Sequence, residues 1–293
     1  MAWSRRDGII AERWTWLGAE ASTRRYARLV RPHGHDVASA VLMVFAPETP
    51  AAEVERVRRA TEELAALGLP VPALFAHDAE AGWILEEDLG DRTLAAAAAA
   101  GEDTAPAYAE ALALLGRLQP QRISTSPTPA LDGTRLRREL AFLACHLPLA
   151  APRGLESECE ALAARCARAP TALCHRDYHA RNLMLHEGRL RWIDHQDALV
   201  GPAVYDRVSL AYDPYVALDD ATRDALAGTG RHVAPVAVQR LLKALGTYLS
   251  QRRHFATSVV PAARQAARLL PRCDLPLPAT ADLLAALAAQ AVA

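Results

Sequence analysis

The stretch Leu173–Ala198, LCHRDYHARNLMLHEGRLRWIDHQDA, decides how the rest of the chain is interpreted, because His, Arg, Asp and a single Asn gather in it between short apolar runs. Its second half, with LML and LRWID on either side of HEG, is typical of a β-hairpin. Asp194 ends the second strand, twelve residues after Asn182. A hairpin folds that strand back beside the first, so Asp194 and Asn182 are expected to face one point.

The first half of the stretch, HRDYHARN, places Asp177 five residues before Asn182. Phosphoryl transfer from ATP needs a carboxylate to orient and deprotonate the attacking hydroxyl, and oxygen ligands for Mg²⁺. His-Arg-Asp with Asn at this spacing supplies the base and one metal ligand, and Asp194 supplies a second. The competing interpretation is a charged surface turn between two strands. That Asn182 is the one asparagine of the chain favours a site.

Upstream of this stretch, the pattern predicts a small antiparallel sheet. RWTWLG, TRRYARLV and DVASAVLMVF between Arg13 and Phe45 are expected to be strands separated by turns. PAAEVERVRRATEELAALG has helical spacing and stops at Gly68 and Pro70, and GWILEEDLGD predicts a buried strand that runs into an acidic turn. The fold class is therefore α+β, with a lobe of sheet, one helix and sheet.

Beyond about Gly90 the chain is rich in Ala and Leu at helical spacing. Helices are expected over residues 94–118, 135–146 and 156–168, with about four more after Asp219. This predicts two domains, an N-terminal nucleotide-binding lobe over residues 1–88 and a mainly helical C-terminal catalytic and substrate-binding lobe over residues 89–293.

Composition narrows the class of partner. The formal net charge of the 293 residues is −1 and no charged tail is present, so nucleic acid is not an expected partner. Five scattered cysteines fit a reducing compartment. The N-terminus has no signal-like apolar run and no stretch is long enough to span a membrane. We therefore expect a cytoplasmic protein. Lys243 is the one lysine.

Several segments resemble the aminoglycoside phosphotransferase/choline kinase superfamily, and within it the bacterial anomeric kinases that phosphorylate N-acetylmuramate and N-acetylglucosamine at C1 during cell-wall recycling. The segments that carry this resemblance are EASTRRYARL (20–29), GLPVPALFAHD (68–78), GWILEEDLGDRTL (82–94), RREL (137–140), HRDYHARNLM (175–184) and IDHQDALVGPAVYDRVSL (193–210). The resemblance implies a bilobal protein-kinase-like fold, ATP and Mg²⁺ as cofactors, and a sugar as the acceptor. We expect a monomer.

The resemblance also implies roles for individual residues. Asp177 would be the catalytic base, and Asn182 and Asp194 the magnesium ligands. Adenine would lie against the backbone of the hinge Glu86, Glu87, Asp88 and Leu89. His175 and Asp206 would support the catalytic loop, Asp206 through hydrogen bonds. Asp197 is similar to a family position just beyond the metal ligand, and no catalytic step is assigned to it.

The sequence departs from the family pattern in the residues expected to bind the nucleotide. Kinases of this fold usually carry a lysine in the third strand, and here Met43 stands near that position. Arg24, Arg25 and Arg28 are expected to supply the charge toward phosphate, since a guanidinium can pair two phosphate oxygens. Strand alternation would put Arg25 on the opposite face from the other two. The alternative is that these are exposed strand arginines.

Two further departures from the family pattern concern the acid expected on the first helix and the residue that follows Asp194. Glu53 or Glu55 would stand in place of the helix acid that normally pairs with the strand lysine, or would be solvent-facing charges. His195 replaces a phenylalanine of the sugar kinases, and a packed aromatic replacement is favoured over a mechanistic histidine.

Substrate recognition is less determined. Arg138 and Glu139, beside Arg137, could hold a lactyl carboxylate and sugar hydroxyls, or could form a solvated helix face. Tyr178, His179 and Arg181 could flank the acceptor. Two other functions remain open, a kinase of the same fold that acts on an aminoglycoside, choline or another alcohol, and a nucleotide-binding pseudokinase.

Overall fold

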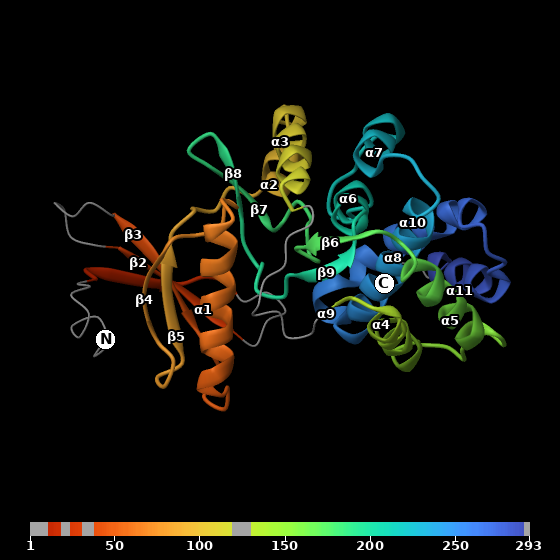
Figure 1. Ribbon diagram of the computed structural model, residues 1–293, viewed down its shortest axis with the longest axis horizontal. Helices are drawn as coiled ribbons and strands as arrows, with labels where there is room; N and C mark the ends of the chain where they lie inside the picture. The colour runs from red at the N-terminus through yellow and green to blue at the C-terminus, as the bar shows by residue number, and fades with distance from the viewer. Residues whose placement is uncertain (1–10, 19–23, 31–37, 119–129, 290–293) are drawn as a thin grey trace. The chain divides into compact units, whose positions relative to one another are not determined.

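The computed structural model describes residues 11–18, 24–30, 38–118 and 130–289, and its contacts divide the chain into two compact units (Figure 1). The first unit contains the described residues up to Arg92 together with Met184–Gln196, and the second contains the remaining described residues. The boundary expected after residue 88 lies four residues before the end of the first segment of this unit at Arg92. A single boundary also leaves out the segment Met184–Gln196, which returns to the first unit. The expected strand ends at Thr23 and 36–37 lie outside the described residues.

Within its described residues, the first unit holds a five-stranded antiparallel sheet with strand order β1-β2-β3-β5-β4. The strands are β1 Arg13–Trp16, β2 Arg25–Val30, β3 Ser39–Val44, β4 Leu74–Asp78 and β5 Trp83–Glu87. The predicted strand regions and the α+β class are confirmed. β4 was not predicted as a strand, since its sequence LFAHD lacks a clear apolar alternation.

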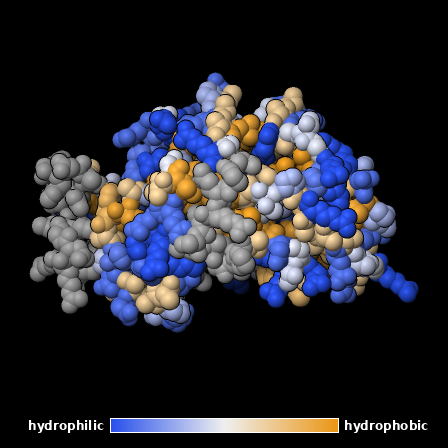
Figure 2. Space-filling model, viewed as in Figure 1, coloured by the Kyte–Doolittle hydropathy of each residue, from blue (hydrophilic) through white to orange (hydrophobic). Residues whose placement is uncertain are grey.

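The helix α1, Ala51–Ala66, packs against one face of this sheet (Figure 1). Val54 and Val57 of α1 are buried against Met43, Phe45 and Ile84. The other face of the sheet has its own apolar cluster, which consists of Ala27, Leu29, Ala40, Leu42, Trp83 and Leu85. The outer side of α1 carries Glu–Arg ion pairs, and it forms a hydrophilic surface in Figure 2.

The predicted hairpin is present as β7, Leu183–His186, and β8, Arg189–Trp192. Its two turn residues, Glu187 and Gly188, have φ of 49° and 74°, as the common two-residue hairpin turn requires. Trp192 N donates to Pro70 O at 2.8 Å and Leu185 N donates to Arg92 O at 2.8 Å. These bonds attach the hairpin to the first unit.

The second unit is mainly helical, as predicted, and is built around the buried helix α8, Val233–Ser250. Helices α4, α5, α6 and α10 pack against α8. The remaining bounds are α2 Leu94–Ala99, α3 Ala105–Gly116, α4 Gly133–Cys145, α5 Leu155–Cys166, α6 Tyr205–Ala211, α7 Asp220–Ala227, α9 Arg252–Phe255, η2 Ala256–Ser258, α10 Val259–Leu269, η3 Leu270–Arg272 and α11 Pro278–Ala288. A two-stranded sheet pairs β6, Thr171–Cys174, with β9, Leu199–Pro202.

The prediction of one helix over residues 94–118 is wrong, because the structure has two helices there, α2 and α3. Gly101 has φ of 73°, and Pro106 lies in the first turn of α3, where it starts a new helix. β6, β9 and α6 were not predicted. Among the described residues, none of the helices is long and apolar enough to cross a membrane.

Candidate functional site

The catalytic-loop candidate, residues 175–182, follows β6 in the second unit. Asp206 on α6 binds the first two residues of this loop. The Asp206 carboxylate accepts hydrogen bonds from the backbone N–H of His175 at 2.6 Å and of Arg176 at 2.9 Å. Arg176 has φ of 78°, a left-handed conformation that costs energy for a residue with a side chain. Two amide donors aimed at one buried carboxylate stabilise this strained turn, and such strain is concentrated at functional sites.

Asp177 is the candidate base of the loop, and its side chain is 27% exposed. Lys243 Nζ on α8 donates to Asp177 Oδ1 at 3.0 Å. Burial raises the pKa of Asp177, but the positive charges of Lys243, Arg176 and Arg240 outweigh burial and hold that pKa well below its usual range. The carboxylate is therefore ionised at neutral pH and can accept a proton from a hydroxyl group.

Asn182 is oriented by the same loop. Its Nδ2 donates to the backbone oxygen of Asp177 at 2.9 Å and lies 3.4 Å from His179 Nε2. Burial, and then the Arg240 charge, lower the pKa of His179 to about 3, so the imidazole is neutral. Because the amide nitrogen is used within the loop, the amide oxygen is the end left to face a cation.

The predicted substrate residues of α4 have different environments. Glu139 Oε1 accepts from Arg176 Nη2 at 2.7 Å, and Glu139 Oε2 accepts from Gln239 Nε2 at 3.1 Å. Arg137 lies 3.6 Å from Glu160, while Arg138 is exposed. Glu139 is thus part of the network that holds Arg176, which favours a positioning role over contact with sugar hydroxyls.

The loop residues predicted to flank the acceptor also separate. Tyr178 is fully buried and its hydroxyl donates to Ala111 O at 3.0 Å, which favours a structural role over substrate contact. Arg181 is exposed and stacks over the Tyr215 ring at 3.9 Å. The His179 ring meets the same tyrosine edge-on at 5.2 Å. Of the three, Arg181 is the residue with an accessible charge.

Asp194 belongs to the first unit, two residues beyond the end of β8. It is exposed and has φ of 58°, and its Oδ1 accepts from Gln196 Nε2 at 2.7 Å. The neighbouring His195 is buried, and its Nε2 lies 2.9 Å from Thr61 Oγ1 on α1. This placement favours the packed replacement over a mechanistic histidine. The expectation that Asp194 ends the strand is corrected, since the strand ends at Trp192.

The three arginines of the nucleotide side are in different environments. Arg28 makes paired hydrogen bonds to both Asp88, at 2.7 and 3.0 Å, and Asp91, at 2.8 and 2.9 Å, so two carboxylates balance its charge. Arg25 is exposed and lies over the Trp16 ring at 3.8 Å.

Arg24 stands just before β2, and its charge acts on the buried Glu86 and on Glu53 of α1. Glu53 is also paired with Arg56 at 2.6 Å, whereas Glu55 pairs with arginines on the outer side of α1. Met43 is buried in the apolar cluster between the sheet and α1. Arg24 is therefore the candidate for the cation that replaces the strand lysine, since its charge acts on both Glu86 and Glu53.

The hinge residues follow β5. Burial raises the pKa of Glu86 to about 7, against the opposing charge of Arg24. Glu87 pairs with Arg191 of the hairpin at 2.5 Å, and its Oε2 accepts from Ala73 N at 2.9 Å. Leu89 is buried, and its backbone oxygen lies 3.2 Å from His186 Nδ1. The hinge is therefore fixed by side chains of the first unit.

Over the described ranges, no group of three or more His, Cys, Asp or Glu side chains is gathered that could hold a metal ion by itself. Magnesium bound to a nucleotide usually takes one or two protein ligands, with phosphate oxygens and waters completing its shell. One amide oxygen from Asn182 and the exposed carboxylate of Asp194 are the kind of ligands that such a metal requires.

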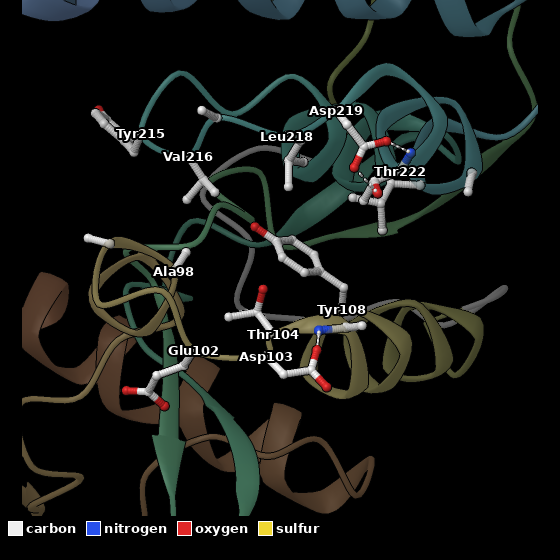
Figure 3. Close-up of a pocket in the computed structure, with 15 residues that line it drawn as sticks. Ala98, Glu102, Asp103, Thr104, Tyr108, Tyr215, Val216, Leu218, Asp219 and Thr222 are labelled. Carbon is white, nitrogen blue, oxygen red and sulfur yellow. Dashed lines mark hydrogen bonds between the residues drawn. The ribbon is translucent and has the colours of Figure 1, made fainter.

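A pocket of about 630 Å³ lies within the second unit (Figure 3). Figure 3 shows Tyr108 of α3 pointing toward Leu218 and the segment that carries Tyr215. Among the described residues, none of the predicted site residues lines this pocket. It adjoins the catalytic loop through Tyr215, which contacts His179.

Sequence reasoning missed two residues that the structure connects to the catalytic loop. Lys243 contacts Asp177, and the signal that could have found it is that it is the one lysine in an arginine-rich chain. Asp213 accepts from Ala180 N at 2.7 Å and Tyr215 N at 2.8 Å, which braces the loop from its far side. Nothing in its surrounding sequence distinguishes Asp213 from a surface acid.

Known proteins share both the sequence and the fold. A kinase of Pseudomonas aeruginosa named N-acetylmuramate/N-acetylglucosamine kinase is 34% identical over an alignment of 215 residues, and the match covers 68% of this chain and 59% of that protein. The protein of the same name from Pseudomonas putida is 31% identical over 216 residues, 71% of this chain and 61% of that protein. The chain thus spans about three fifths of the length of the curated relatives it matches.

Among solved structures, a choline/ethanolamine kinase family protein from Mesorhizobium loti superimposes with a TM-score of 0.61 at 16% identity, over 94% of this chain and 92% of that one. A choline kinase from Streptococcus pneumoniae gives a TM-score of 0.60 at 14% identity, over 93% and 97%. These likenesses confirm the kinase-like fold. The profile of the phosphotransferase enzyme family matches residues 14–236, three quarters of the sequence, so the chain belongs to the phosphotransferase enzyme family.

Proposed function

We propose that this protein is an ATP-dependent kinase that phosphorylates the anomeric C1 hydroxyl of N-acetylmuramate, N-acetylglucosamine or both. The observation that carries the proposal is Asp177, an ionised and partly exposed carboxylate on a braced loop, with the amide of Asn182 fixed beside it. The choice of acceptor is supported by the curated relatives, which carry the name of that activity.

The proposed reaction is an in-line transfer. The anomeric hydroxyl oxygen forms a bond to the γ-phosphorus while the bond between that phosphorus and the β–γ bridging oxygen breaks, and ADP leaves. Asp177 is ionised, so it can orient the hydroxyl and accept its proton as the new bond to phosphorus forms. A positioned base of this kind typically contributes about 10²- to 10⁴-fold to the rate.

Asn182 and Asp194 are the residues we propose for Mg²⁺, which when bound would neutralise charge on the β- and γ-phosphates. Asn182 offers its amide oxygen, since its nitrogen is engaged with Asp177 O. Asp194 is exposed, and its Oδ1 accepts from Gln196 Nε2 at 2.7 Å. Both are hard oxygen donors of the kind this metal prefers.

The nucleotide is proposed to bind in the first unit. Arg24 is the candidate for the phosphates, since Arg28 is occupied by Asp88 and Asp91. The hinge backbone from Glu86 to Leu89 is the candidate for adenine. We further propose a cytoplasmic monomer, in keeping with five cysteines that are all unpaired.

The test is ADP release together with phosphorus NMR of the products. Purified protein receives Mg·ATP and, separately, N-acetylmuramate, N-acetylglucosamine, glucose, choline and kanamycin. A sugar 1-phosphate signal from the N-acetylated sugars is expected. Phosphorylation of choline or kanamycin alone would reassign the acceptor within the family. ATP binding without transfer to any acceptor would favour a nucleotide-binding pseudokinase, for which the buried Met43 is the supporting observation.

A further inference from the structure

Helix α8 brings one ammonium group to the proposed base. Lys243 Nζ donates to Asp177 Oδ1 at 3.0 Å, and within the described residues this is the one hydrogen bond of that ammonium. The side chain of Lys243 is 21% exposed, close to the 27% of Asp177. An ammonium group has three donors, so two of them remain for other partners.

The other cations near Asp177 are already engaged. Arg176 is buried and bonded to Glu139, which in turn accepts from Gln239, one turn before Lys243 on α8. Arg240 is buried and its Nε donates to Ser209 Oγ at 2.7 Å. Lys243 thus differs from both arginines, because its charge reaches the surface beside the carboxylate on which the acceptor hydroxyl would rest.

We propose that Lys243 binds a carboxylate of the acceptor and gives the enzyme a preference for N-acetylmuramate over N-acetylglucosamine. The inference rests on the proposed sugar kinase function and adds the residue that distinguishes its two acceptors. The two sugars differ by a lactyl ether on O3, which carries a carboxylate and lies two ring carbons from the reacting C1. Lys243 contacts the carboxylate on which the C1 hydroxyl would rest, so its ammonium is an accessible cation close to the reacting end of the sugar.

The chemistry of lysine suits this role. Its ammonium is a point charge on a flexible four-carbon stem, so it can keep contact with Asp177 or turn to a second carboxylate. A hydrogen bond between two charged groups is roughly twice as strong as one between neutral groups. N-acetylglucosamine offers no such partner, and its binding should not depend on this charge.

Arg138 is the rival for the same carboxylate. It is exposed on α4, next to Glu139. A carboxylate bound there would make Lys243 a positioning residue for Asp177, with no part in telling the sugars apart. The two assignments therefore predict different variants to lose the preference.

The experiment compares kcat/KM for the two sugars, at saturating Mg·ATP, in the wild type, Lys243→Met, Lys243→Arg and Arg138→Met. Arg264→Met, which removes an exposed charge from α10, is the matched control. Lys243→Met is expected to lower the ratio of kcat/KM for N-acetylmuramate over that for N-acetylglucosamine by about tenfold or more, mainly through KM. Lys243→Arg should retain most of the preference.

An equal fall for both sugars in Lys243→Met would overturn the inference, since Lys243 would then act through Asp177 alone. A loss of preference in Arg138→Met with none in Lys243→Met would also overturn it, as would a wild type without preference for N-acetylmuramate. Failure of the proposed function is a separate result, because the wild type would then phosphorylate neither sugar. Thermal unfolding of each variant excludes a folding defect.

Discussion

Asp206 in the second unit and Glu86 in the first are both buried carboxyl groups, but their surroundings differ. Asp206 accepts two backbone N–H groups at 2.6 and 2.9 Å. Glu86 has no such pair of donors among the described residues, and burial raises its pKa to about 7 against the charge of Arg24. Asp206 positions a loop through its hydrogen bonds, whereas Glu86 has a pKa close to neutral pH.

The comparison separates two uses of a buried acid. The bonds to Asp206 fix the start of the catalytic-loop candidate, and their loss should cost both stability and turnover. Burial raises the pKa of both acids, but Glu86 lacks a pair of backbone donors among the described residues, so removal of its charge should help the folded state. Variants of the loop and of the hinge test this difference between the two acids.

Asp177→Asn should reduce kcat by about 10³-fold, because the amide cannot accept the hydroxyl proton while its shape is retained. Binding of a fluorescent ATP analogue should stay within about twofold of the wild type. A variant with wild-type turnover would show that the braced loop does not carry the base.

Glu86→Gln should stabilise the protein by up to about 3 kcal/mol at pH 8. The folded-state pKa of about 7 lies above the unfolded value of 4.5, so the folded state binds the extra proton between these values. The stability of the wild type should thus fall, relative to the variant, as pH rises from about 4.5 through 7. Urea unfolding at pH 4, 6 and 8 measures this, and a difference that is the same at all three would contradict it.

Asp206→Asn should destabilise the protein by about 2 kcal/mol, because the amide oxygen can still accept one N–H while the amide nitrogen faces the other donor. Urea unfolding gives the loss, and kcat should fall with KM for ATP little changed. The exposed acid Asp91, which pairs with Arg28, is the control. Asp91→Asn should cost less than about 1 kcal/mol.

Arg24→Met should raise KM for ATP about tenfold through loss of charge toward phosphate. Arg28→Met should change it less, since that guanidinium is held by Asp88 and Asp91. An equal rise in KM for ATP in the two variants would mean that Arg28 leaves its two carboxylates to bind the nucleotide.

Local sequence was sufficient for part of this structure. The spacing of Asp177 and Asn182, the turn at Glu187–Gly188 and the end of α1 at Ala66, just before Gly68, each depend on a few adjacent residues. The acid Asp206 followed from the family resemblance, and the structure adds the two bonds through which it holds the loop.

Contacts between distant segments could not be predicted in this way. Lys243 lies 66 residues after Asp177, and Arg28 lies 60 before Asp88. β6 and β9 pair with each other although residues 175–198 separate them in the sequence, and neither has a strong pattern alone. The break at Gly101 was hidden by a run of alanines, which favours a helix whatever follows it.

A chain with one lysine contains its own spectroscopic reporter. Growth on lysine labelled with ¹³C at the ε carbon should give one side-chain resonance, and that resonance belongs to the group 3.0 Å from Asp177. Its chemical shift would follow the arrival of nucleotide and each sugar without mutation. The same amine, one-fifth exposed, is also the one lysine that acylating reagents can label, so protection by a sugar would be read at a single peptide in mass spectrometry.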